Sequence, residues 1–460
     1  MFYGRNKELG KLNEMYGSGK FEFAVIYGRR RVGKTTLIRE FIKDKKALFF
    51  AASESTAADN LSSLSKCIGG KNNAPIFQDY ESMLTAVFEA GQNERLVFVI
   101  DEYPYLAEAY RGISSLLQIK IDHNKDNSKL MIILCGSSMS FMENQVLGYK
   151  SPLFGRRTAQ FKILPFNFYD SLPFFTEFKP IDKAVLYGMT GGIPEYLSKI
   201  NSKKGIRENI IDLFLTTNGH FFEEPSNLIK QELREPATYN VIIEAIASGA
   251  SRLSEIAAKS GLESNKCGKY LGALITLGLV SKEYPFDEKS VKRSIYKLED
   301  FMFRFWYRFV FPNMSSIVAG AGMNVYDNEI EKQLNAYMGL IFEEICKEYL
   351  WKKLIEGNAV MDFTNLGRWW GNDPRTKSQV EIDIMGTDRK DSALFAECKW
   401  MNEKTDLPVL ETLINRSELF NYKNKHFYLF SKTGFTKGCV ARAAELGNVT
   451  LICYSDMIKT

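Results

Sequence analysis

The stretch FEFAVIYGRRRVGKTTLIREFI, from Phe21 to Ile42, decides the fold of the first part of this chain. Its centre, GRRRVGKT at residues 28–35, matches the pattern G-x-x-x-x-G-K-[ST] of phosphate-binding P-loops. An apolar run at 23–27 precedes the loop, and apolar residues at helical spacing follow it (Leu37, Ile38, Phe41 and Ile42). A strand, a glycine-rich loop and a helix are the context that the pattern requires, so we predict a P-loop rather than an ordinary glycine-rich turn.

Each residue type in this loop has a chemical role. Gly28 and Gly33 can take backbone conformations closed to residues with a Cβ, which lets the loop wrap phosphate with its N–H groups pointing inward. Lys34 is expected to contact the β- and γ-phosphates at the positive end of the following helix, and Thr35 to offer its hydroxyl to Mg²⁺. The loop residues expected to bind nucleotide with them are Arg29, Arg30, Arg31, Val32 and Thr36.

Further strands are expected around the P-loop strand. Candidates at 22–27, 47–52, 96–101, 130–136 and 159–164 alternate with helical or polar stretches, which predicts a parallel α/β sheet. The third candidate ends in Asp101 and Glu102, a Walker B arrangement at the strand end that faces the ligand crevice. We expect Asp101 to hold Mg²⁺ through water and Glu102 to polarise the attacking water. Beside a P-loop, this interpretation is favoured over two acids that merely mark a solvated strand end.

Two later segments carry weaker signals. The strand ending in LCGSS places Ser137 where a hydroxyl would sense the γ-phosphate, although a plain strand-ending turn explains it equally well. Arg156, in SPLFGRRTAQF, is a candidate to neutralise transition-state charge on the γ-phosphate, directly or from a neighbouring subunit. A solvated basic turn is the alternative for Arg156, and still more for Arg157.

The segments FYGRNKEL, GRRRVGKT, VFVIDEY, LCGSSMS, PLFGRRT and TGGIPEYL, in this order, resemble the archaeal-type ATPase family, a branch of the STAND and AAA+ P-loop ATPases. The resemblance covers about residues 1–220. It implies ATP as the nucleotide, a sheet whose sensor strand lies between the two Walker strands, and a helical lid at about 165–222. It also implies that Gly4 and Arg5 lie near the adenine and that Pro194 marks the start of the lid motif.

The middle of the chain resembles a winged-helix domain. Three short helices are expected within 238–284, and strands at 280–284 and 294–298 would form a wing joined by DEKSVKR. The second helix of the helix-turn-helix, 264–278, would use Leu271, Leu274, Ile275 and Leu277 as its core face. Exposed Asn265, Lys266 and Lys269 would meet DNA, and Lys289, Lys292 and Arg293 on the wing would add phosphate contacts. A structural spacer is the alternative.

The last part of the chain carries a set of acids with a lysine. Side chains alternate along strands, so SQVEIDIMG (378–386) and ALFAECKW (393–400) each present alternate residues on one face. The result is a D…E-x-K set formed by Asp383, Glu397 and Lys399, with Glu343 on an upstream helix at 330–354. Carboxylates gathered in this way bind Mg²⁺, and an adjacent lysine can activate water and stabilise a scissile phosphate. A solvated acid with a nearby ion pair is the alternative.

This tail resembles the PD-(D/E)XK nuclease superfamily. Together with the junction FRFWYRFV, it is also similar to an uncharacterised domain that usually follows the archaeal-type ATPase module. The resemblance covers about 296–460 and implies that Glu343, Asp383 and Glu397 are metal ligands and that Lys399 completes the catalytic set. The aromatic residues of the junction recur at helical spacing and are expected to pack a core rather than to stack on bases (Phe301, Phe305 and Phe309).

Composition limits the class of protein. A length of 460 residues suggests about three domains at ~150 residues each. The seven Cys form no C-x-x-C pair and the three His are far apart, which argues against a disulfide framework or structural zinc and fits a reducing cytoplasm. The start, MFYGRNKEL, has no signal-peptide character, and the aromatic run at 301–311 is far shorter than the ~20 residues that span a membrane.

The sequence therefore predicts an α/β protein with three domains. These are a P-loop AAA+-type ATPase domain with a helical lid at 1–222, a winged helix at 223–300, and a restriction-endonuclease-like domain with its junction helix at 301–460. The expected activity is ATP hydrolysis that controls a Mg²⁺-dependent nuclease-type domain acting on DNA, with a homo-oligomer as an open option. The alternatives are a regulatory ATPase whose C-terminal domain only binds nucleic acid or a partner protein, and a nucleotide-driven interaction scaffold.

Overall fold

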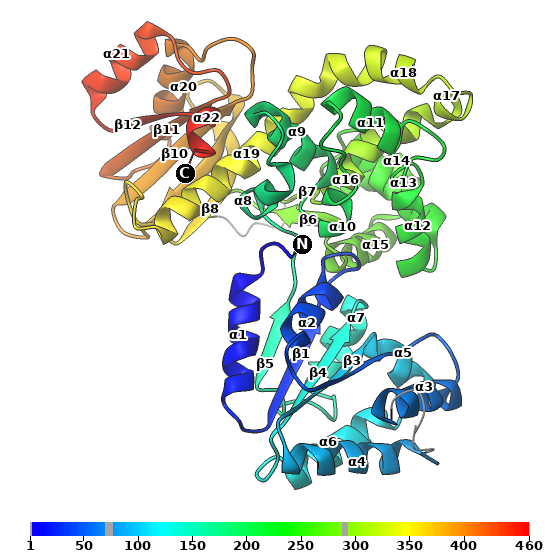
Figure 1. Cartoon of the computed structure of the whole chain (residues 1–460). Helices are drawn as coiled ribbons and strands as arrows, with labels where there is room; N and C mark the ends of the chain where they lie inside the picture. Colours follow the sequence, from blue (N-terminus) through cyan, green and yellow to red (C-terminus); the bar gives the residue numbers. More distant parts are fainter. Residues whose placement is uncertain (1, 70–76, 288–292, 460) are drawn as a thin grey trace. The chain divides into compact units, whose positions relative to one another are not determined.

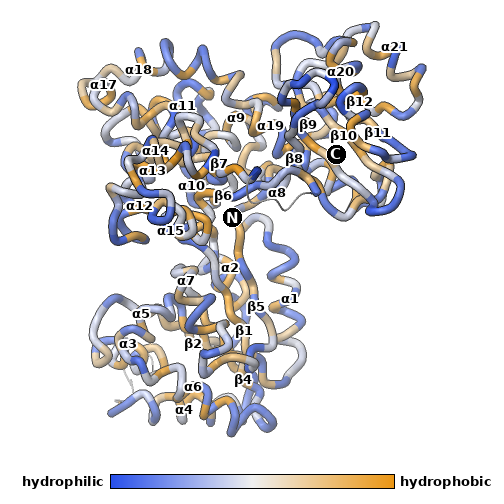
Figure 2. The backbone as a smooth tube through the Cα atoms, turned by 180° about the vertical axis from the view of Figure 1, so that it is seen from behind, coloured by the Kyte–Doolittle hydropathy of each residue, from blue (hydrophilic) through white to orange (hydrophobic). Residues whose placement is uncertain are grey.

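The computed structural model describes residues 2–69, 77–287 and 293–459 (Figure 1). The chain divides into two compact units. The first comprises Met1–Phe166 together with Ile193–Glu195, and the second comprises Asn167–Gly192 together with Tyr196–Thr460. Hydrophobic residues concentrate along the strands of both large sheets (Figure 2), where most strand residues are buried. No helix in the described part of the chain is both long and apolar enough to cross a membrane.

The first unit is built on a five-stranded sheet in the order β2-β3-β4-β1-β5, with every neighbouring pair parallel. The strands lie within a residue or two of the predicted ranges. The order confirms that the sensor strand β4 lies between the P-loop strand β1 and the Walker B strand β3, as in AAA+-type ATPases. The bounds are β1 (Glu22–Tyr27), β2 (Ala47–Ala51), β3 (Leu96–Asp101), β4 (Leu130–Gly136) and β5 (Ala159–Lys162).

Helices cover this sheet because its central strands are almost entirely apolar. Strands β3 and β4 are buried at every position, as expected for a parallel sheet whose two faces are both covered. The covering helices are α1 (Asn6–Gly17), α2 (Lys34–Ile42), α3 (Ala57–Gly69), α4 (Tyr80–Asn93), α5 (Tyr103–Ala109), α6 (Ile113–Asn124) and α7 (Met139–Phe141).

The second unit begins with the helices expected to form a lid. They are α8 (Phe168–Ser171), α9 (Pro180–Thr190), α11 (Ile206–Phe214) and α12 (Glu224–Glu232), and the residues of α10 (Pro194–Leu197) are divided between the two units. Helix α9 packs closely against α19 (Glu331–Ile355), because a Cβ at Gly188 would lie 2.9 Å from the sulfur of Met338. Tyr337 of α19 also donates a hydrogen bond to the Gly188 carbonyl at 2.6 Å. This packing explains why these helices group with the rest of the chain. The domain boundary at 222 stays a prediction.

Three helices and a hairpin follow, as expected from the sequence: α13 (Pro236–Ala247), α14 (Leu253–Ser260), α15 (Ser264–Thr276), β6 (Val280–Glu283) and β7 (Ile295–Leu298). The hairpin strands are antiparallel. The buried face of α15 is Cys267, Tyr270, Leu271 and Leu274. Ile275, predicted to lie in the core, is 38% exposed instead, because the buried residues recur at spacings of three and four and Ile275 lies at the margin of the face that they form.

The aromatic junction forms α16 (Phe301–Phe305) and a π-helical turn (Trp306–Val310). Trp306 is fully buried and its indole N–H donates to the Phe222 carbonyl at 2.8 Å, so the aromatic residues pack a core as predicted. The short helices α17 (Met314–Val318) and α18 (Gly322–Val325) lead to the long helix α19.

The C-terminal part of the second unit is a five-stranded mixed sheet in the order β12-β11-β10-β9-β8. Strands β8, β9 and β10 are antiparallel neighbours, and β10, β11 and β12 are parallel. Strand β8 was not predicted, because its glycines and polar residues interrupt the run of apolar residues that indicates a strand. The elements are β8 (Asn365–Asp373), β9 (Ser378–Thr387), β10 (Ser392–Lys399), α20 (Leu407–Ser417), β11 (Asn424–Ser431), α21 (Lys437–Leu446), β12 (Val449–Cys453) and α22 (Tyr454–Met457).

Candidate functional site

The loop after β1 has the geometry of a P-loop. Gly28 tolerates no side chain, since a Cβ there would lie 2.3 Å from the carbonyl oxygen of Ile163. Gly33 has a φ of 88° and precedes helix α2, and Arg31 has a φ of 70°. Lys34 is buried, and its Nζ donates to the carbonyl of Arg29 at 2.9 Å across the loop. The loop therefore holds the lysine ammonium at the start of a helix, where both favour an anion.

The end of β3 faces this loop. The Thr35 hydroxyl donates to Asp101 Oδ2 at 2.8 Å, and the backbone N–H of Glu102 donates to Asp101 Oδ1 at 3.0 Å. Glu102 has a φ of 51°, a left-handed conformation that is strained for a residue with a Cβ. Its carboxylate accepts hydrogen bonds from the hydroxyl of Ser137 at 2.8 Å and from the Ser137 N–H at 3.3 Å. The structure thus joins the two Walker elements to the sensor strand.

Residues from both ends of the first unit border the same loop. The Arg5 guanidinium donates to the carbonyls of Val32 (3.2 Å) and Leu164, and it lies over the ring of Phe166 at 4.4 Å. Gly4, with a φ of 66°, leaves no room for a Cβ beside that ring. These contacts bring Gly4 and Arg5 to the P-loop, while the predicted proximity to adenine stays a prediction.

Two further contacts complete the rim of the loop. Pro194 lies 3.6 Å from the position of a Cβ on Gly33, and the Arg30 guanidinium donates to the Tyr105 hydroxyl at 3.1 Å. Pro194 belongs to Ile193–Glu195, a short segment that groups with the first unit although the residues on both sides of it do not. The chain thus returns to the P-loop at the residue expected to open the lid motif.

Arg156 does not lie at this site. It precedes β5, which runs parallel to β1, so it lies at the amino end of the sheet whereas the P-loop lies at the carboxyl end. Its guanidinium forms a two-pronged ion pair with Asp122 at 2.8 and 2.7 Å. The fold therefore corrects the expectation of a direct contact with the chain's own nucleotide. A contribution to a neighbouring subunit stays a prediction.

The donor set around the loop suits a magnesium nucleotide. A buried ammonium and a helix N-terminus favour phosphate, and a hydroxyl with a carboxylate 2.8 Å away offers the oxygen ligands that Mg²⁺ prefers. Lys34 with the loop N–H groups would hold the phosphates, and Thr35 with Asp101 would hold the ion.

A second group of charged residues lies in the C-terminal sheet. Strands β9 and β10 pair with Ala396 opposite Ile384, so the next pair in this register sets Glu397 opposite Asp383. The backbone N–H of Cys398 donates to Asp383 Oδ2 at 2.8 Å, and both carboxylates are buried. The structure therefore brings together the two strand acids whose pairing the sequence left open.

The electrostatics of this group show how close its members lie. Burial, followed by the charge of Glu397, raises the pKa of Asp383. Burial, followed by the charge of Asp383, raises the pKa of Glu343 on α19, so the helix glutamate lies near the strand acids as expected. Glu397 forms ion pairs with Lys399 (2.6 Å) and Arg416 (3.4 Å). All four predicted residues thus gather at one place.

The side chains of these residues have the chemistry of metal ligands, but their arrangement is not that of a metal site. Carboxylate oxygens suit Mg²⁺. Among residues 2–69, 77–287 and 293–459, however, no group of three or more His, Cys, Asp or Glu side chains is arranged to hold a metal ion. The ion pairs of Glu397 explain part of this result, because they turn its carboxylate toward two cations.

Sequence reasoning missed the arginines around these acids. Arg368 on β8 pairs with Glu381, and although burial lowers its pKa, the charges of Glu343 and Glu381 raise it. Arg416 on α20 pairs with Glu397 and also donates to the Glu381 carbonyl. Neither arginine belongs to a recognisable motif. The sequence could have indicated them only through their positions in the predicted sheet.

The predicted DNA-contact residues divide into three groups. Asn265, Lys266 and Lys269 are exposed at the start of α15, as expected. Arg293 instead donates to the Trp370 carbonyl on β8, and the Trp370 indole donates to the Arg293 carbonyl at 3.2 Å, which corrects its assignment as a solvent-facing wing residue. Lys289 and Lys292 lie outside the described residues.

Comparison with known proteins agrees with this geometry. Residues 2–200 match a family described as an ATPase domain predominantly from Archaea, and residues 306–409 match a family described as "Archaea bacterial proteins of unknown function". An uncharacterised protein of Methanocaldococcus jannaschii is 34% identical over 413 residues, which cover 88% of each chain. An uncharacterised ATP-binding protein of the same organism is 46% identical over 46 residues, 10% of this chain and 78% of the relative. A Walker-type ATPase of Pyrococcus abyssi shares the fold with a TM-score of 0.51 and 20% identity, over 67% of this chain and 96% of the other.

The sheet order, the P-loop and the paired acids at the end of β3 define a P-loop ATPase of the AAA+ type. Within that class, the chain belongs to the archaeal-type ATPase family and carries the C-terminal domain of unknown function that matches residues 306–409.

Proposed function

We propose that this ATPase acts on DNA and that its nucleotide state controls a Mg²⁺-dependent nuclease-type site in the C-terminal sheet. The observation that carries the proposal is the gathering of Asp383, from the middle of β9, with Glu397 and Lys399 at the end of β10, while Glu343 reaches them from α19. Carboxylates can hold Mg²⁺ beside a phosphodiester, and a lysine can stabilise the charge that develops on the phosphate.

The energetics of this group support a role for a cation. Like charges at one buried place repel one another. Burial and this repulsion together raise the pKa of Asp383 and of Glu343. A divalent cation between these carboxyls would remove the penalty. Glu397 would then have to exchange at least one of its ion pairs, with Lys399 or Arg416, for the ion.

In the ATPase site, the roles follow from the contacts around the loop. Lys34 would hold the phosphates, and Thr35 with Asp101 would fix Mg²⁺, which supplies positive charge to the transferring phosphoryl group. Glu102 would orient the attacking water once its carboxylate leaves Ser137. The hydrogen bond from Ser137 therefore supports a state in which Glu102 is not yet free to act.

The helices α13–α15 with the β6–β7 hairpin would form the winged-helix module that binds DNA. The exposed Asn265, Lys266 and Lys269 at the start of α15 support this assignment, because a recognition helix meets DNA at its N-terminal end.

A regulatory ATPase with an inactive C-terminal domain is the second candidate. It is favoured by the two ion pairs on Glu397, which occupy the carboxylate that a metal would need. In that case the domain would bind nucleic acid or a partner protein without cleaving.

The test is a cleavage assay on the full chain with end-labelled single- and double-stranded DNA, in Mg²⁺ or Mn²⁺, with and without ATP. Wild type should nick DNA, and Asp383→Asn should lower the rate ~10²-fold or more through loss of a metal ligand. Asp391→Asn is the matched control, since Asp391 is an exposed acid of the same hairpin, paired with Lys423. DNA-stimulated ATP hydrolysis without cleavage would support the regulatory alternative. A rate of ATP hydrolysis that is the same with and without DNA, in the absence of cleavage, would refute action on DNA.

A further inference from the structure

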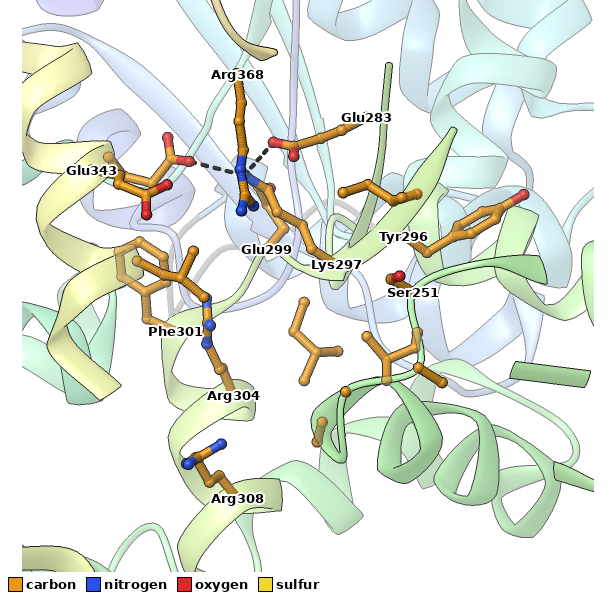
Figure 3. Close-up of a pocket in the computed structure, with 18 of the residues that line it drawn as sticks. Ser251, Glu283, Tyr296, Lys297, Glu299, Phe301, Arg304, Arg308, Glu343 and Arg368 are labelled. Atoms are coloured by element: carbon orange, nitrogen blue, oxygen red, sulfur yellow. Dashed lines mark hydrogen bonds and ion pairs between the residues drawn. The ribbon is translucent and has the colours of Figure 1, made fainter. Parts of the chain in front are cut away.

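A cavity of about 410 Å³ lies within the second unit, and no P-loop residue lines it. Its walls come from the loop after α13, the β6–β7 hairpin, α16 with the following π-helical turn, α19 and β8 (Figure 3). The volume falls in the range of ~300–1,000 Å³ that is usual for small-ligand sites. The ATPase site contributes no residue to this cavity, and of the four predicted residues gathered at the C-terminal sheet only Glu343 lines it.

The cavity is lined by five basic and four acidic residues, and most of them neutralise one another. Lys297 pairs with Glu283 and with Glu344 (2.8 Å), and Lys347 pairs with Glu344 at 3.0 Å. Although burial raises it, these two lysines lower the pKa of Glu344 to about 2. Arg368 is paired with Glu381 outside the cavity. Two of the five basic residues that line the cavity stand outside these ion pairs.

Arg304 and Arg308 are those two cations. The Arg304 guanidinium lies over the ring of Tyr337 at 5.8 Å, and Arg308 donates to Gln333 Oε1 at 3.0 Å. Throughout the described ranges, neither forms an ion pair with a carboxylate. Figure 3 shows both side chains projecting from the same stretch of helix.

Two guanidinium groups on the same stretch of helix repel each other. Burial lowers the pKa of Arg304, Tyr337 and the charges of Glu343 and Glu344 raise it, and the charge of Arg308 lowers it. A phosphate dianion bound by two guanidinium groups would relieve the repulsion and supply the missing acceptors.

An aromatic wall continues from the two arginines. Phe301, Arg304 and Arg308 follow one another at spacings of three and four residues, which sets them along one side of the helix over about 10 Å. Phe301 is only partly buried, and three aliphatic side chains line the cavity with it (Ile246, Leu298 and Leu340). An aromatic ring beside two guanidinium groups matches a ligand with a planar base at one end and a phosphate at the other.

We propose that this cavity binds a nucleoside monophosphate, either free or as the 5′ end of a nucleic-acid strand, with its phosphate on Arg304 and Arg308 and its base against Phe301. The carboxyl of Glu343, which lines the same cavity, offers a hydrogen-bonding partner to the sugar or base.

The test measures binding by titration calorimetry with the full chain carrying Lys34→Ala, so that the P-loop does not compete. The probes are AMP, adenosine, inorganic phosphate, and an oligodeoxynucleotide with a 5′-phosphate or a 5′-hydroxyl. AMP should bind about tenfold or more tightly than adenosine, because charge-assisted hydrogen bonds to the phosphate are lost in adenosine. Arg308→Gln should weaken AMP binding by a similar factor.

Two further variants keep the proposal falsifiable. Arg304→Lys retains the charge and serves if Arg304→Gln fails to fold, and it should still weaken AMP binding relative to wild type because it loses the forked guanidinium donors. Arg234→Gln is the matched control, as an exposed arginine of the same unit outside the cavity. Tighter binding of the 5′-phosphorylated strand than of AMP would assign a strand end, and the reverse would assign a free nucleotide. AMP and adenosine binding alike, or AMP binding indifferent to Arg304 and Arg308, would overturn the proposal.

Discussion

The pKa of Glu348 on α19 gives a quantitative test of how the helices of the second unit pack. Its carboxyl accepts hydrogen bonds from the Phe168 N–H at 2.6 Å and from the Tyr187 hydroxyl at 3.1 Å. Burial raises its pKa to about 8, against the opposing effect of these two donors, and the nearby Glu344 and Asp170 raise it further. The acid therefore joins the helices expected to form a lid to the helix that carries Glu343.

The size of the effect follows from linkage. The pKa of Glu348 is raised in the folded state, so its contribution to stability is fully present below the ordinary value of 4.5 and is lost as pH rises through about 8. At 1.36 kcal/mol per pKa unit, the loss between pH 5 and pH 9 is on the order of 4 kcal/mol. Glu348→Gln keeps a carbonyl acceptor and cannot ionise. At pH 5 it should match wild type within about 1 kcal/mol, and at pH 9 it should be the more stable protein.

Tryptophan fluorescence isolates the unit in question, since all five tryptophans lie in it (Trp306, Trp351, Trp369, Trp370 and Trp400). Urea unfolding of wild type and Glu348→Gln would be followed at each pH from 5 to 9. Asp383 and Glu343 titrate in both proteins, so the difference between the two midpoints reports Glu348 alone. Glu356→Gln, an exposed residue of the same helix paired with Lys352 and Lys353, should show no such divergence. Midpoints of Glu348→Gln and wild type that stay parallel across this range would refute the reasoning.

Three other predictions concern nucleotide and DNA. Lys34→Ala should abolish tight ATP binding, whereas Glu102→Gln should keep binding and slow hydrolysis ~10²–10⁴-fold, as single-turnover measurements would record; wild-type hydrolysis by Glu102→Gln would disprove the Walker B role. The double variant Lys266→Glu with Lys269→Glu should weaken DNA binding and flatten its salt dependence by about 0.9 in the log–log slope per lost phosphate contact, and an unchanged gel shift would leave α13–α15 as a spacer. Arg156→Ala mixed with Lys34→Ala should regain ATP hydrolysis only if Arg156 acts on a neighbouring subunit; no gain at any mixing ratio would argue against that role.

The sequence by itself was enough wherever the physics is local. A glycine and a lysine at a helix start, and two acids after a buried strand, are each encoded within a few consecutive residues. Continuous apolar runs likewise located the strands of the first sheet, and apolar residues at helical spacing located the helices α13–α15. For these features, residues close by in the sequence determine the conformation.

The tertiary structure decided what depends on residues far apart in the chain. The register of β9 against β10 set Glu397 opposite Asp383, and the direction of β5 carried Arg156 to the edge of the sheet away from the P-loop. Strand β8 formed despite its glycines, because β9 offered it pairing partners on both sides of an irregularity at Arg368. The two arginines of the cavity belong to the junction FRFWYRFV, but only the packing of distant elements around that segment forms the cavity that they line. Strand order, register and the packing of helices on sheets come from burial summed over many distant contacts, and no short stretch of sequence contains that sum.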